Sequence, residues 1–217
     1  GEVGSGKSLF AQSIHNTSPC SKGPFVTFDC AAQTADQTDA LTRAGRAASG
    51  GTLYLDNLDR LDQGGQRVLC RLLREGVVHV PDEESPSPVA VRVIASLAGD
   101  LARELEAGTF QAELYYLLTP LRLALPPLRS RQEDLNQAID MCLDDCVVKF
   151  KRYVVLTKDA RKRLTDYPWP GNYIQLRAFL ERMVLTAPSR TVHANYVAGL
   201  LQELYPAPPG EALPPPE

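Results

Sequence analysis

Long apolar runs and an excess of basic residues are both missing from this sequence. No apolar run approaches the roughly 20 residues that a membrane-spanning helix needs, which excludes a transmembrane segment of that kind. The 23 lysines and arginines are outnumbered by 26 aspartates and glutamates, giving a formal net charge of −3. Coating of nucleic acid requires clustered cations, so we expect any DNA contact to come from a domain outside this chain.

Cysteines are few, and no two have the CxxC spacing of a zinc or redox motif. The five are Cys20, Cys30, Cys70, Cys142 and Cys146. Their odd number and scattered positions argue against a disulfide framework. Cys142 and Cys146 have the i, i+4 spacing of one helix face, but no histidine is near them in the sequence, so we expect buried, inert thiols. No secretory signal pattern opens the chain, and the cytoplasm is the expected location.

The 217 residues, 44% of them hydrophobic, suit a soluble α/β domain with a small second domain. Three segments bounded by glycine or proline predict strands, namely Phe25–Asp29, Thr52–Asp56 and Val89–Ala95. Apolar residues at helical spacing predict helices over Ser8–His15 and Gln66–Glu75. Strands that alternate with helices in this way predict a parallel sheet flanked by helices.

Two proline-rich regions and a change of pattern divide the rest of the chain. Residues 81–88 (PDEESPSP) predict a turn or flexible loop, because prolines and acids do not sustain a strand ladder. After Pro126-Pro127 the segments have helical period with no strand signal between them: Gln132–Lys151, Lys158–Asp166, Tyr173–Ala187 and His193–Leu204. We therefore predict an α/β domain over residues 1–128, a small all-helical subdomain over 129–205, and a Pro-rich tail over 206–217.

The first eight residues, GEVGSGKS, match the phosphate-binding pattern GxxxxGK[ST] at every defined position. In this P-loop, backbone N–H groups cradle phosphates, the lysine reaches the outer phosphates, and the final hydroxyl binds Mg²⁺. The predicted nucleotide contacts are Gly1, Val3, Gly4, Ser5, Gly6, Lys7 and Ser8. A helix follows the loop directly, as the pattern requires, whereas the strand expected before the loop is missing from this sequence.

An aspartate ends the predicted strand Thr52–Asp56, about 50 residues after the P-loop, as in a Walker B element. Asp56 is therefore predicted to bind the nucleotide's Mg²⁺ through water, together with Ser8. The expected cofactors are ATP or ADP and Mg²⁺. A lone histidine such as His15, at the end of the first predicted helix, is more often structural or a helix cap than a ligand contact, and we assign it no role.

Further motifs follow the P-loop in a definite order across residues 1–205. They are Cys30-Ala31-Ala32, GGTLYLD (50–56), VRVIA (91–95), Leu114-Tyr115-Tyr116, LPPLRSRQED (125–134) and Trp169-Pro170-Gly171-Asn172. Together they resemble the central AAA+ domain of bacterial sigma-54-dependent transcription activators. The resemblance implies an α/β nucleotide domain followed by a helical lid, with possible self-association of subunits through the AAA+ interface.

The sequence departs from that family at positions that stabilise the transition state of hydrolysis. The family has a glutamate after the Walker B aspartate to polarise water, but this chain has Asn57, whose amide cannot act as a general base. Gln111 and Leu117 replace two arginines that reach a neighbour's nucleotide in the family. Ala98 replaces the sensor asparagine, and Ile174 replaces the lid arginine. We therefore expect nucleotide binding with impaired hydrolysis, a pseudo-ATPase.

A further departure concerns the partner protein. Only residues 33–49 separate the Cys30-Ala31-Ala32 motif from Gly50, roughly half the family's length, and no Gly-Ala-Phe-Thr-Gly-Ala loop occurs there. That loop contacts sigma-54 in the family. A stable contact between this chain and sigma-54 is therefore not expected.

Three functions remain open on the sequence alone. The favoured one is a regulatory domain that binds nucleotide with little turnover. A working ATPase would require substitutes, with Glu75, Asp59 or Glu113 as the base and Arg43 or Arg46 as the finger. The third is an interaction module that has lost nucleotide binding and keeps only the fold.

Overall fold

The computed structural model describes residues 1–32, 36–79 and 85–205 of the chain. It divides into two compact units, the first of residues 1–125 and the second beginning at Pro126. The predicted Pro-rich tail at 206–217, the first half of the predicted loop at 81–88 and the start of the short 33–49 segment lie outside the described residues. In the described part of the chain, no helix combines the length and the apolar character needed to cross a bilayer.

A parallel sheet forms the centre of the first unit, with strand order β1-β2-β5. Its strands are β1 (Phe25–Asp29), β2 (Thr52–Asp56) and β5 (Arg92–Ala95). The bounds predicted for β1 and β2 are confirmed. The third strand begins later than predicted, because the Val89 N–H donates to Gly76 O at 2.7 Å and so joins a separate hairpin.

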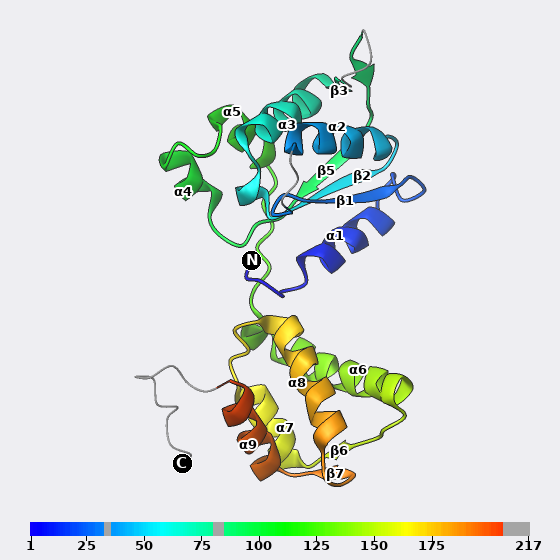
Figure 1. Ribbon diagram of the computed structural model, residues 1–217, viewed down its shortest axis with the longest axis vertical. Helices are drawn as coiled ribbons and strands as arrows, with labels where there is room; N and C mark the ends of the chain where they lie inside the picture. Colours follow the sequence, from blue (N-terminus) through cyan, green and yellow to red (C-terminus); the bar gives the residue numbers. More distant parts are fainter. Residues whose placement is uncertain (33–35, 80–84, 206–217) are drawn as a thin grey trace. The chain divides into compact units, whose positions relative to one another are not determined.

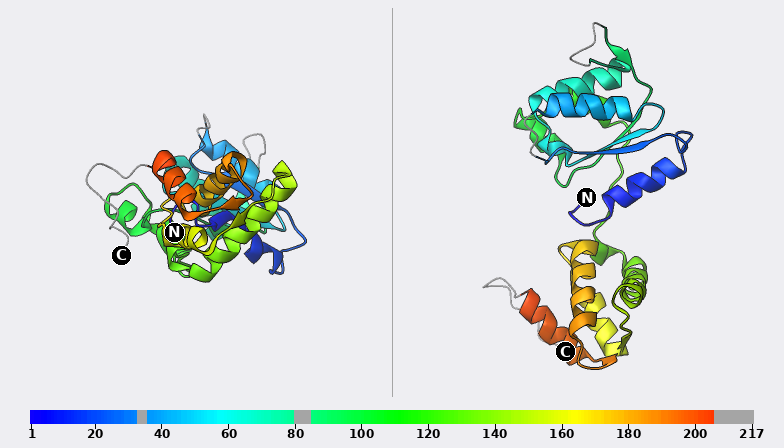
Figure 2. Two further views of the ribbon diagram at one scale, coloured as in Figure 1. Left: turned by 90° about the horizontal axis from the view of Figure 1, so that it is seen from below. Right: turned by 45° about the vertical axis from the view of Figure 1, so that its right-hand side comes forward.

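Helices cover both faces of this sheet, with α1 on one side and α2 and α3 on the other (Figures 1 and 2). The helical segments of the unit are α1 (Lys7–Asn16), α2 (Gln37–Ala47), the 3-10 turn η1 (Leu58–Arg60), α3 (Gln63–Glu75), α4 (Leu101–Glu106) and α5 (Ala112–Leu118). The α3 helix begins before the predicted Gln66 because the Asp62 side chain caps it, accepting the Gly65 N–H at 2.6 Å. Fully buried leucines such as Leu53, Leu55 and Leu69 form the core between sheet and helices.

A short hairpin corrects part of the loop prediction for residues 81–88. β3 (Val77–Val78) pairs antiparallel with β4 (Ser87–Pro88), so the last two residues of the predicted loop form a strand. Proline is tolerated here because each strand of a two-stranded ribbon has one edge that needs no ladder hydrogen bond.

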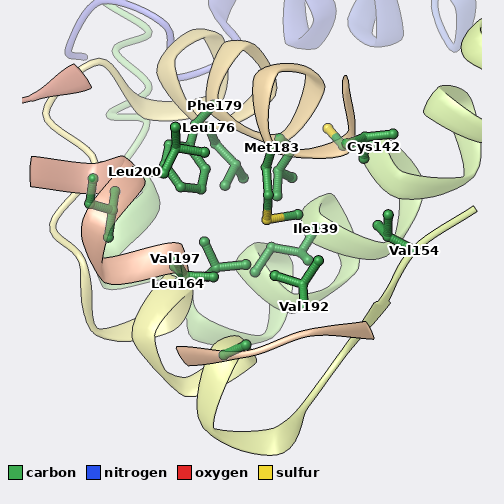
Figure 3. Close-up of a cluster of buried hydrophobic side chains, with 14 of the residues drawn as sticks. Ile139, Cys142, Val154, Leu164, Leu176, Phe179, Met183, Val192, Val197 and Leu200 are labelled. Carbon is green, nitrogen blue, oxygen red and sulfur yellow. The ribbon is translucent and has the colours of Figure 1, made fainter. Parts of the chain in front are cut away.

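The second unit is the predicted helical subdomain, built around one apolar core. Its helical segments are the 3-10 turn η2 (Leu128–Ser130), α6 (Gln132–Phe150), α7 (Lys158–Asp166), α8 (Asn172–Thr186) and α9 (Ala194–Leu204). Figure 3 shows side chains from these helices, among them Ile139, Leu164 and Phe179, pointing into the shared interior. Two strands that the sequence did not signal, β6 (Val155–Leu156) and β7 (Thr191–Val192), form a parallel pair beside the helices.

The structural role expected for His15 is confirmed by its surroundings. Only 3% of the residue is exposed, its Nδ1 lies 2.9 Å from Thr52 Oγ1, and its ring centroid is 5.3 Å from that of Phe25. The imidazole therefore joins α1 to the sheet.

We predict that His15→Ala lowers the free energy of unfolding of the first unit by about 1–3 kcal/mol, because Thr52 loses its buried hydrogen-bond partner. Urea denaturation measures the change. Gln12→Ala, on the exposed side of the same helix, is the control and should have little effect. Equal losses in the two variants would contradict the structural role.

Candidate nucleotide site

The P-loop, residues 1–8, adopts a backbone that only glycine accommodates easily. Gly4 and Gly6 have φ angles of 74° and 93°, in the left-handed region that favours glycine. Gly6 is also the N-cap of α1, and no side chain caps the helix there. The first-turn N–H groups of a helix have no partner within the helix, and the helix dipole is positive at this end. A loop of this geometry is able to accept an anion.

Lys7 lies over this loop. Its Nζ donates to Gly1 O and to Glu2 O, both at 3.0 Å. The ammonium group is therefore tied to the start of the P-loop. Of the other predicted contacts, Ser5 is buried at 4% exposure, whereas Val3 and Ser8 are exposed.

A polar network surrounds Asp56 at the end of β2. Its Oδ1 accepts hydrogen bonds from Tyr54 Oη at 3.2 Å, from the Asn57 N–H at 3.1 Å and from Ser96 Oγ. Tyr54 also donates to Ser96 at 2.9 Å. Burial and the Asp56 charge outweigh the Ser96 hydrogen bond and raise the pKa of Tyr54 to about 12, so its hydroxyl remains a donor at neutral pH.

Sequence reasoning missed Tyr54 and Ser96. Tyr54 had a local signal, because residues two apart on a strand share a face and Tyr54 is two before Asp56. Ser96 had none, since its approach to Asp56 depends on β5 pairing with β2.

One cavity of about 390 Å³ brings the P-loop together with this network. Gly1 and Lys7 line it on one side, and Tyr54 and Ser96, the neighbours of Asp56, line it on another. Apolar side chains of α1, β5 and residues 117–125 complete the wall, along the edge of the sheet that β5 forms. That Ser8 and Asp56 share a Mg²⁺ ion stays a prediction, as does a further strand ahead of the P-loop.

Two of the three carboxylates suggested as substitute bases, Glu75 and Glu113, are engaged elsewhere. Glu75 and Glu113 both pair with Arg74, at 2.6 and 2.9 Å. Arg74 and Glu75 stand in the last turn of α3, and the helix starts soon after β2 ends. At a rise of 1.5 Å per residue, Glu75 lies roughly 18 Å along the helix from its first residue, Gln63. Asp59 Oδ1 is enclosed without a partner among the described residues, and Oδ2 lies 3.5 Å from Arg60.

Asn57 instead contacts a different acid. Its Nδ2 donates to Asp29 Oδ1 at 2.8 Å. Asp29 ends β1 as Asp56 ends β2, so the two aspartates occupy the same edge of the sheet.

Three positions where the resembled family has arginines carry other side chains here. Gln111 precedes α5, and its Nε2 lies 3.3 Å from Gln63 Oε1 on α3, so the amide packs back against its own subunit. Leu117 lines the cavity, and Ile174 on α8 is 64% exposed.

Four of the five cysteines are buried. Cys142 and Cys146 are buried as expected, Cys30 and Cys70 are buried as well, and Cys20 is intermediate. Burial, followed by the charges of nearby aspartates, raises the pKa of Cys30 to about 12. No cluster of three or more potential metal-binding side chains of His, Cys, Asp or Glu occurs among the residues the structure describes.

Comparisons with known proteins agree with this geometry. Residues 1–128 match the family described as Sigma-54 interaction domain, and residues 129–210 match the AAA+ ATPase lid domain. The anaerobic nitric oxide reductase transcription regulator NorR of Salmonella agona (strain SL483) is 34% identical over 98% of this chain and 46% of its own length. The Nif-specific regulatory protein of Klebsiella pneumoniae is 33% identical over 91% of this chain and 41% of its own length.

A solved structure extends the likeness to three dimensions. The crystal structure of NtrX from Brucella abortus in complex with ADP superposes with a TM-score of 0.81 at 27% identity, covering 97% of this chain and 51% of that protein. The chain thus spans about half or less of the length of these relatives. The chain has a P-loop α/β domain and a helical lid, and the family model matches its first 128 residues. This chain therefore belongs to the sigma-54 interaction domain family of AAA+ proteins.

Proposed function

We propose that this chain is the nucleotide-binding AAA+ part of a bacterial transcription regulator, which binds ATP or ADP with Mg²⁺ and hydrolyses ATP slowly. The observation that carries the proposal is the P-loop, with glycines in left-handed geometry, an uncapped helix N-terminus and Lys7 above the loop. NtrX, which has the same fold at 27–28% identity, has been crystallised with ADP and with ATP.

The residues present fit the expected ligands. Backbone N–H groups of the P-loop and the Lys7 ammonium would hold the phosphates, and Ser8 with Asp56 would hold Mg²⁺. When bound, the ion neutralises phosphate charge. The Ser96 and Tyr54 hydroxyls keep the Asp56 carboxylate oriented. These are contacts with the bound nucleotide and do not require the transition state.

Slow hydrolysis follows from the groups that are missing. An arginine finger from a neighbouring subunit is worth about 10³ to 10⁵ in rate. Gln111 and Leu117 stand at the two positions where the family has such arginines. Gln111 is moreover bonded to α3 of its own subunit. The amide of Asn57 cannot take a proton from water.

The proposal extends to partners. The α2 helix occupies Gln37–Ala47 of the short segment between β1 and β2, which leaves few residues for a loop that contacts sigma-54. We expect no stable capture of sigma-54, self-association through the AAA+ interface, and DNA binding through another domain.

Nucleotide titration tests the central claim. We expect ATP and ADP to bind with Mg²⁺-dependent affinity in titration calorimetry, and a ligand at 100 times its dissociation constant to stabilise the domain by roughly 2.7 kcal/mol. Asp56→Asn should remove most of the Mg²⁺ dependence and keep Mg²⁺-free binding. No heat and no thermal shift at millimolar nucleotide would favour an interaction module instead.

A further inference from the structure

The ends of β1 and β2 place a carboxylate next to the position where the family has its glutamate. The two strands are parallel, and Asp29 pairs with Asp56 in register, so their backbones lie about 4.8 Å apart at the carboxyl edge of the sheet. Ligands of parallel sheets bind outside this edge. Asn57, immediately after Asp56, has a φ of 55°, which turns the chain out of the strand.

Asn57 and Asp29 form a complementary pair. The Asn57 Nδ2 donates to Asp29 Oδ1 at 2.8 Å, and the Ala31 N–H donates to the same oxygen at 2.9 Å. No described residue donates a hydrogen bond to the other oxygen, Asp29 Oδ2, and Asp29 is exposed to water. One oxygen is thus fixed by two donors while the other remains able to accept a proton.

The other candidate carboxylates are less suited to this role. Asp56 has hydrogen bonds from two hydroxyls and a backbone N–H. One oxygen of Asp59 is enclosed, and Glu75 and Glu113 pair with Arg74. Asp29 is the carboxylate that Asn57 itself holds.

We propose that Asp29, positioned by Asn57, accepts the proton of the attacking water in the slow ATP hydrolysis of this domain. The assignment rests on the proposed function, because it requires nucleotide on the P-loop. The water oxygen forms a bond to the γ-phosphorus, and the bond from that phosphorus to the β–γ bridging oxygen breaks, with its electron pair leaving on ADP. The water proton passes to Asp29 Oδ2 and then to solvent. Asn57 acts as a positioning residue, since its amide holds Oδ1.

Single-turnover phosphate release tests the assignment, with Lys7→Ala as the blank. Asp29→Asn should lose about 10²- to 10⁴-fold in rate, down to the blank, while ADP affinity by calorimetry stays close to that of the unmodified domain. Asp144→Asn, an exposed aspartate on α6, is the matched control and should change neither quantity.

Thermal unfolding without nucleotide tests the pair independently of turnover. Asn57→Asp sets two carboxylates against each other and should lower the Tm, most strongly at low salt. Adding Asp29→Asn to Asn57→Asp restores a carboxylate and an amide in transposed positions, and should restore the Tm.

The outcomes separate the two claims. No nucleotide affinity in the unmodified domain overturns the proposed function and this assignment with it. Normal affinity with unchanged release from Asp29→Asn overturns the assignment alone. Release from the unmodified domain that equals the Lys7→Ala blank overturns the assignment and the slow hydrolysis in the proposed function, and leaves nucleotide binding standing. Failure of Asp29→Asn to restore the Tm of Asn57→Asp overturns the positioning role of Asn57.

Discussion

Replacing Lys7 with alanine should lower ATP and ADP affinity at least about 100-fold and remove most of the thermal shift that nucleotide produces in the unmodified domain. A stabilisation of roughly 2.7 kcal/mol at 100 times the dissociation constant corresponds to a Tm rise of about 5–10 °C for a domain of this size, and Lys7→Ala should keep at most about 2 °C of it at the same nucleotide concentration. The reason is positional. Lys7 is the first residue of α1, and its Nζ bonds to two carbonyls of the P-loop.

Two comparisons make this result specific. Lys22→Ala removes an exposed lysine from the loop between α1 and β1, and should leave the nucleotide shift intact. Since Lys7 also bonds to the P-loop backbone, the Tm of Lys7→Ala without nucleotide measures any loss of loop structure separately. Full retention of nucleotide affinity in Lys7→Ala would show that the nucleotide binds without this side chain, and would contradict the role assigned to Lys7.

Local composition was enough to predict the main elements. β1 and β2 are short, mostly apolar runs between a glycine or proline and a final aspartate, and their predicted bounds are confirmed. The pair β6 and β7 could not be predicted. Two residues are too few for a period, and the pairing joins segments more than 30 residues apart.

The candidate site divides in the same way. The P-loop is a contiguous motif, and the conformations of Gly4 and Gly6 agree with its requirements. The bond from Asn57 to Asp29 spans 28 residues, and the bond from Ser96 to Asp56 spans 40. Both depend on strand order, which a single sequence does not specify. The substitution at position 57 therefore indicated a lost base, while the carboxylate beside it became visible only in the structure.

The Asp29–Asn57 pair changes what restoring activity requires. Asn57→Glu by itself would bring a second carboxylate to the place where an amide now donates to Asp29. Like charges at this distance disfavour ionisation of both groups, so one would hold a proton and serve poorly as a base. If Asp29 is the base, the two arginines that Gln111 and Leu117 replace are the next transition-state groups to supply.

We therefore expect Gln111→Arg combined with Leu117→Arg, with Asp29 and Asn57 unchanged, to raise ATP hydrolysis about 10³-fold at protein concentrations where subunits associate. This is the lower end of the effect of an arginine finger. Phosphate release across a broad concentration range measures it, because a group supplied by a neighbour makes the rate rise with assembly. Tyr116→Arg adds an arginine at an exposed position of the same helix α5 and should produce no gain.

Two further variants decide how the gain arises. Adding Asp29→Asn to the double arginine variant should abolish the gain, and adding Lys7→Ala should do the same through loss of nucleotide. If the double arginine variant associates, as sedimentation would show, and still does not exceed the unmodified rate, the missing arginines are not what limits hydrolysis. If the gain instead requires Asn57→Glu, the base belongs at position 57, and Asp29 serves only to hold Asn57 in its left-handed turn.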